Sequence, residues 1–155
     1  MAACDVITTG PKAMKNTIAV MNTKGGVGKS TVVMGLAETF SVFEGKSVLV
    51  VDSDSQASVS SMLMSTTDLY KLQSGGRTIV EYLVAMVLNG QTEAWRNYVV
   101  ADVSDVDDAN SISVFPSDIQ LTLFEREVSR EIKHTHLRTV IGNLLDELRS
   151  SFDII

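Results

Sequence analysis

Hydrophobic residues follow two alternating patterns along the chain. Short runs of apolar and β-branched residues, at 17–22 and 46–51, are typical of strands buried in a parallel sheet. Longer stretches with apolar residues three and four positions apart, at 30–43 and 137–149, are typical of amphipathic helices. This alternation predicts an α/β fold with a mostly parallel sheet and helices on both of its faces.

Weaker patterns complete the expected order of elements. Residues 57–76 predict a short helix and then a loop at Ser74, Gly75 and Gly76. Thr78 can cap a helix that runs through Leu88.

The second half of the chain predicts a further strand and helix. Ser111 to Phe115 alternate as a strand, Pro116 stops it, and Ser117 can cap the helix that follows. Residues 1–16, with Gly10 and Pro11, predict a flexible lead-in, so the expected domain covers 17–155.

The eight residues KGGVGKST, Lys24 to Thr31, lie directly between the first strand and the first helix. Gly25, Gly26 and Gly28 let the backbone turn sharply and approach a polyanion closely with its N–H groups. The loop leads into the first turn of a helix, where unpaired amides and the positive dipole end attract phosphate. Strand, glycine loop, Lys-Ser pair and helix together predict a phosphate-binding loop rather than an ordinary glycine turn.

Side chains of this loop predict contacts to a nucleotide and a metal ion. Lys29 places a positive charge on the β- and γ-phosphates, and the Ser30 hydroxyl is positioned to ligate Mg²⁺. Thr31 can reach the α-phosphate, and Val27 contributes backbone to the same cradle.

Two carboxylates follow the second strand. Residues 47–51 are apolar except at Ser47, and the run ends abruptly in Asp52, Ser53 and Asp54. Carboxylates at this end of a parallel strand face the ligand crevice, and a spacing of two puts them on the same side. One can hold hydrated Mg²⁺ and the other can orient an attacking water; we expect Asp52 nearer the metal and Asp54 at the water.

Composition narrows the classes of protein. The chain has 155 residues, of which 45% are hydrophobic and 21% charged, enough for one domain with a core. The single cysteine, Cys4, offers neither a disulfide framework nor a thiolate metal site, and no apolar run has membrane-spanning length. A formal net charge of −6 repels nucleic acid at long range, so DNA binding requires a local basic patch or regions outside this chain.

One departure from the usual loop carries a family resemblance. The general pattern has a glycine five residues before Gly28, where this chain has Thr23, and a second lysine, Lys24, precedes the glycine pair. This is the deviant Walker A form, and here the chain resembles the ParA/MinD/Soj family of partitioning ATPases. Asn22, Thr23 and Lys24 are most similar to the ParA branch, as is ISVFPSDIQLTLFERE, in which a strand ends in Pro-Ser and an acidic helix follows.

The resemblance implies a P-loop NTPase fold and hydrolysis of ATP with Mg²⁺. It implies that Lys24 reaches across a dimer interface to the partner's nucleotide, with Lys29 and Asp54 as the other catalytic residues. The expected protein is a cytoplasmic, ATP-gated homodimer, open to association with the nucleoid, that positions plasmid or chromosomal DNA or another large cargo. Expected partners are a centromere-binding protein that stimulates hydrolysis and non-specific DNA bound through regions outside this chain.

Two departures leave other functions open. Ser55 stands where the family has proline, which predicts a less rigid switch loop. Residues 152–155 resemble the start of the strand that leads to the family's Walker B aspartate, so we expect a domain truncated before that acid. A nucleotide-responsive scaffold that hardly hydrolyses ATP is therefore an alternative. The family resemblance leaves a third function open, that of a MinD-like regulator on the membrane surface.

Overall fold

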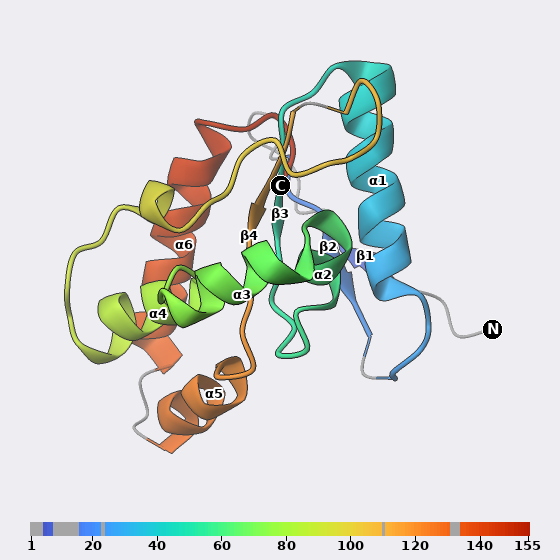
Figure 1. Ribbon diagram of the computed structural model, residues 1–155. Helices are drawn as coiled ribbons and strands as arrows, with labels where there is room; N and C mark the ends of the chain where they lie inside the picture. The colour runs from blue at the N-terminus through green and yellow to red at the C-terminus, as the bar shows by residue number, and fades with distance from the viewer. Residues whose placement is uncertain (1–4, 8–15, 23, 110, 131–133) are drawn as a thin grey trace.

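The computed structural model describes residues 5–7, 16–22, 24–109, 111–130 and 134–155 (Figure 1). Strands and helices alternate through these ranges, in this order: β1 (Asp5–Ile7), β2 (Ala19–Met21), α1 (Lys29–Glu44), β3 (Val48–Val51), α2 (Ser58–Leu63), α3 (Thr66–Ser74), α4 (Ile79–Leu83), a π-helical turn (Val84–Leu88), a 3-10 turn (Trp95–Asn97), β4 (Ile112–Phe115), α5 (Leu121–Arg130) and α6 (His134–Arg149). None of the described helices is long and apolar enough to cross a membrane.

The centre of the sheet is parallel. β3 and β4 pair in parallel, with Val48 opposite Ile112 at one end of the register. The 153–155 segment joins them to β2: Ile154 forms a parallel bridge with Val48, and the Ile18 N–H donates to the Ile155 carbonyl at 2.8 Å. The predicted α/β fold with a parallel sheet is confirmed.

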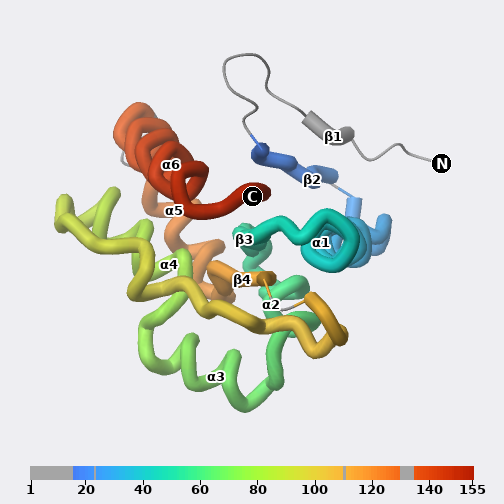
Figure 2. The backbone as a smooth tube through the Cα atoms, turned by 90° about the horizontal axis from the view of Figure 1, so that it is seen from above, coloured from blue at the N-terminus to red at the C-terminus, as the bar shows by residue number. Residues whose placement is uncertain are grey.

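Helices cover both faces of β3 and β4. Val48 and Val50 pack with one hydrophobic cluster that includes Ala37 of α1 and Val59 of α2. Leu49 points the other way, into a second cluster built by α4, α5 and α6. Figure 2 shows the same division, with α1 on one side of the two strands and α6 on the other. β3 is apolar at every position because both of its faces are buried.

Local signals explain where the helices begin and end. Gly45 ends α1 in a left-handed conformation (φ 59°), and its N–H donates to the Phe40 carbonyl, as a C-terminal glycine does. Thr78 caps α4 by accepting a hydrogen bond from the Val80 N–H at 3.2 Å, as predicted. The predicted helix continues to Leu88, but its last five residues are π-helical.

Two local predictions were wrong. Ser117 does not cap the following helix: α5 begins at Leu121, and Asp118 makes the local hydrogen bond by accepting from the Gln120 N–H at 2.7 Å. Ser117 is instead fully buried, and its N–H donates to the Ser60 Oγ at 3.2 Å. The segment 57–76 holds two helices rather than one, and α3 extends through Ser74 before the chain turns at the glycine pair.

The predicted lead-in is described only in part. Residues 5–7 form β1, which pairs antiparallel with β2, a strand that the sequence pattern did not indicate. The rest of 1–15 lies outside the described residues, as do Cys4 and Thr23.

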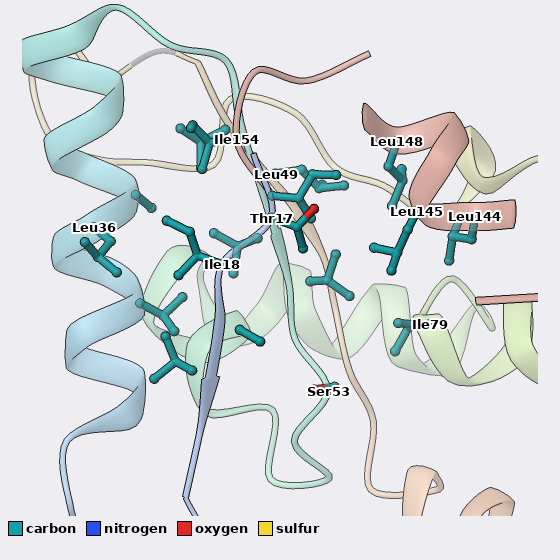
Figure 3. A pocket seen from close by; sticks show the side chains of 18 of the residues that line it. Thr17, Ile18, Leu36, Leu49, Ser53, Ile79, Leu144, Leu145, Leu148 and Ile154 are labelled. Carbon is teal, nitrogen blue, oxygen red and sulfur yellow. The ribbon is translucent and has the colours of Figure 1, made fainter. Parts of the chain in front are cut away.

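A long apolar cavity of about 470 Å³ separates β2 from β3. Aliphatic residues of both strands line it, together with others from α1 and α6 (Figure 3). Ile154 lies at one end of the cavity and Ser53 at the other. The 153–155 segment therefore links the two strands at their amino ends, while the carboxyl ends face each other across the cavity.

The link at the amino ends depends on Asp153 and predicts an acid-sensitive contribution to stability. The Ser47 N–H and hydroxyl donate to the Asp153 carboxylate at 2.9 and 2.8 Å, and these bonds hold the pKa of Asp153 below its usual value of 3.8. Because the folded pKa is lowered, the stabilisation is present at pH values above 3.8 and is lost as the pH falls through the folded pKa.

Asp153→Asn should therefore lower the urea midpoint near neutral pH and have progressively less effect under acid conditions. Asp105→Asn, which changes an exposed aspartate of the loop before β4, is the control and should leave both midpoints nearly unchanged. A loss in Asp153→Asn that was the same at neutral and acid pH would contradict this account.

Candidate phosphate-binding site

The loop before α1 owes its shape to two glycines. Gly26 and Gly28 have φ values of 70° and 87°, in the left-handed region that other L-residues rarely adopt. Gly28 is the N-cap of α1, and its carbonyl accepts the Val32 N–H at 2.9 Å to begin the helix. On the other side of the loop, the Lys24 N–H donates to the Asn22 side chain at 2.8 Å.

Gly25 differs from Gly26 and Gly28 in its backbone conformation. Its φ lies outside the left-handed region, and a Cβ built on it would meet no other atom within 4 Å. Neither backbone conformation nor crowding within the protein therefore requires a glycine at this position. A larger residue at this position would occupy the open space beside the loop and leave less of it for a ligand.

The first turn of α1 places polar groups beside this space. Lys29 and Ser30 are the first two residues of the helix and are half-buried, whereas Thr31 is exposed. No acidic residue lies in this turn of the 16-residue helix, so its unpaired amides and dipole present a positive end. These groups, with Val27 half-buried in the loop, fit a phosphate chain.

Asp52 follows β3 and is held inside the protein. Its side chain is 3% exposed. One carboxylate oxygen, Oδ1, accepts the Asp54 N–H at 3.1 Å. The other, Oδ2, accepts both the N–H and the hydroxyl of Ser60, at 2.8 and 2.7 Å.

Asp54 is bound within its own turn. Its Oδ1 accepts the Gln56 N–H at 3.0 Å, and its Oδ2 accepts the Ser58 hydroxyl at 3.4 Å. Its carbonyl accepts the Ala57 N–H at 2.8 Å, which closes the turn before α2. Asp54 is half-buried, so its carboxylate has more access to solvent than that of Asp52.

The phosphate-loop candidates and the two carboxylates lie at the same end of the sheet. Figure 1 shows the loop before α1, the turn after β3 and the start of α5 all toward the lower end of the molecule. Within the described ranges, no hydrogen bond joins Lys29 or Ser30 to either aspartate. The same ranges hold no group of three or more His, Cys, Asp or Glu side chains that could bind a metal ion. A metal ion at this edge would therefore need oxygen ligands from phosphate or water as well.

Ser60 and Ser117 also lie at this end of the sheet. The sequence pattern did not identify either residue as part of the candidate site. Ser60 is fully buried in α2, and its Oγ accepts the Ser117 N–H at 3.2 Å while its hydroxyl donates to Asp52. The only sequence signal was a serine inside an otherwise apolar helical face, between Val59 and Leu63.

Comparisons with known proteins agree with this architecture. A family model described as AAA domain (AAA_31) matches residues 15–155. The crystal structure of protein DIP2308 from Corynebacterium diphtheriae is similar over 86% of this chain, with a TM-score of 0.61 and 21% sequence identity, which supports the fold alone. The chain spans about half of that protein, 48% of its length. No curated protein matches the sequence.

The backbone conformation of the loop predicts different effects of two glycine substitutions on the free energy of unfolding. Gly28→Ala should lower the free energy of unfolding by about 1 to 2 kcal/mol, because it forces a Cβ into the left-handed region. Gly25→Ala should leave that free energy unchanged or raise it slightly, because its φ and surroundings accept a methyl group. Urea unfolding of both variants measures the difference, and equal losses would show that the loop does not have this backbone geometry.

Proposed function

The chain belongs to the ParA/MinD-like family of P-loop proteins, and on that premise we propose that it binds and hydrolyses ATP with Mg²⁺. The observation that carries the proposal is the loop before α1. Two glycines at positive φ lead its backbone into the positive end of a long helix, with open space beside Gly25. An extended anion such as a triphosphate is the ligand that this arrangement fits.

Each residue of the site has a distinct part in the proposal. Backbone N–H groups of the loop bind the phosphates, and the Lys29 ammonium adds a fixed positive charge. Ser30 and Asp52 are the residues that would hold Mg²⁺ and its waters, and the bound ion would neutralise charge on the phosphates. Asp54, the less buried of the two aspartates, orients the water that attacks the terminal phosphate.

We further propose that ATP binding gates a homodimer that positions DNA or another large cargo. Lys24 is exposed at the start of the loop, which leaves its side chain available to a second protomer. In this arrangement, the bound nucleotide of one protomer forms part of the contact with the other. A centromere-binding protein that stimulates hydrolysis is the partner that such a cycle needs.

One observation favours a second function, a nucleotide-responsive scaffold with little turnover. Both oxygens of the Asp54 carboxylate already accept hydrogen bonds within their own turn, from Gln56 and Ser58. If these bonds persist when nucleotide binds, they keep the Asp54 carboxylate within its own turn and away from the attacking water. Steady-state phosphate release, measured with and without DNA, separates the two functions: the ATPase turns over, and the scaffold binds ATP without releasing phosphate.

Substitutions in the loop before α1 should weaken nucleotide binding even where they leave the free energy of unfolding unchanged. Lys29→Ala should weaken binding of a fluorescent ATP analogue by about 10- to 100-fold, the effect of one charge-assisted contact. Gly25→Ala should also weaken it, because the added methyl group occupies the space above the loop. Gly35→Ala, a like change on the exposed face of α1, is the control and should bind as the wild type does. Wild-type affinity in both loop variants would remove the phosphate-binding assignment.

Dimerisation should depend on Lys24. Lys24→Ala should keep ATP binding, because Lys29 and the loop amides remain, yet should lose the dimer that forms when ATP is added. Light scattering with and without ATP measures this, and Lys46→Ala, which removes another exposed lysine, is the control. An ATP-induced dimer of Lys24→Ala would show that this lysine has no part in the contact.

A further inference from the structure

Three structural elements meet at one buried hydroxyl. Ser60 belongs to α2, Asp52 follows β3, and Ser117 follows β4. The exposed fractions of the three residues are 0%, 3% and 0%, so water does not compete for the hydrogen bonds between them. Ser60 and Asp52 lie eight residues apart in sequence, and Ser60 and Ser117 lie 57 apart.

The chemistry of the groups determines which way each hydrogen bond runs. The Ser117 N–H can only donate, so the oxygen that it meets must accept. The Ser60 Oγ must therefore accept from Ser117 and direct its own proton to Asp52, at 3.2 and 2.7 Å respectively. The Ser60 N–H donates to the same carboxylate oxygen at 2.8 Å. Ser60 thus binds Asp52 through both its backbone and its side chain.

Among the residues that the structure describes, these contacts leave one acceptor position on the Asp52 carboxylate. Oδ2 receives both hydrogen bonds from Ser60, and Oδ1 receives one from the Asp54 N–H. A carboxylate oxygen accepts about two hydrogen bonds, so Oδ1 retains the capacity for one more. Rotation of the carboxylate would break bonds on both oxygens at once, and this fixes the direction in which the remaining lone pair points.

We propose that Ser60 is a positioning residue, which fixes the Asp52 carboxylate for the water shell of Mg²⁺ and ties it to the end of β4. The inference rests on the proposed nucleotide site, to which it adds the group that orients the metal-side aspartate. Groups that orient a metal's ligands without touching the metal commonly change metal affinity or activity by 10- to 100-fold when removed.

A purely structural role for Ser60 makes a different prediction. If the hydroxyl only stabilised the packing of α2, its loss would lower the unfolding midpoint and leave the effect of Mg²⁺ on nucleotide binding unchanged. The discriminating quantity is therefore the magnesium enhancement, the ratio of the dissociation constant of a fluorescent ATP analogue in EDTA to that in Mg²⁺.

Ser60→Ala should reduce the magnesium enhancement by about 10-fold while leaving the affinity in EDTA near the wild-type value. Ser61→Ala is the matched control on the same helix. Its hydroxyl is on the exposed side and donates to carbonyls of its own turn, so the enhancement should not change. Thermal unfolding of each variant confirms that it is folded, and Ser60→Cys, which fills the site with a weak donor, replaces Ser60→Ala if that variant does not fold.

A double-variant comparison tests whether Ser60 acts through Asp52. Asp52→Asn should also reduce the magnesium enhancement, and adding Ser60→Ala to it should cause little further loss. An unchanged enhancement in Ser60→Ala, or losses that multiply in the double variant, would overturn this inference while leaving the proposed function intact. A wild-type protein that bound no nucleotide would instead reject the proposed function, and this inference with it.

Discussion

Burial of β3 on both of its faces is the constraint on which the rest of the structure depends. Because successive residues of the strand are apolar, helices must cover each side, and α1 with α2 packs on one face while α4 and α6 pack on the other. Asp52 is the first residue after β3, where the chain leaves the core. β4 is buried in the same way and is followed by Ser117 and Asp118. The packing of the core thus determines the edge at which the polar groups gather.

Elements with local signals could be predicted from the sequence. Gly45 ends α1, Thr78 begins α4, and the apolar run of β3 stops at a charged residue, so neighbouring residues decide each boundary. The loop before α1 belongs to the same class, since Gly26 and Gly28 act through their own φ angles. Ser117 is different: a helix cap was a sound local expectation, but its N–H donates to Ser60, 57 residues earlier in the sequence. The same distance explains why the contact between Ser60 and Ser117 could not be predicted.

Asp52 and Asp54 are residues of one type whose carboxylates differ because their surroundings differ. Their spacing of two predicted a common side of the chain, and the Asp54 N–H does bond to Asp52. Their carboxylates nevertheless meet different partners. Asp52 is held by a buried helix residue and cannot turn without breaking several hydrogen bonds, whereas Asp54 bonds only to groups of its own turn and of the start of α2. One carboxylate is therefore fixed by the fold, and the other can be released by a change in a single loop.

The link between β2 and β3 has a consequence for the site. The two strands are joined at their amino ends through the 153–155 segment, where Ile154 bridges Val48 and the Ile18 N–H donates to the Ile155 carbonyl. The loop before α1 follows β2, and Asp52 follows β3. The alignment of these two parts of the candidate site is therefore transmitted along the strands from the opposite end of the sheet, where residues 106 positions apart in sequence, Ser47 and Asp153, are in contact.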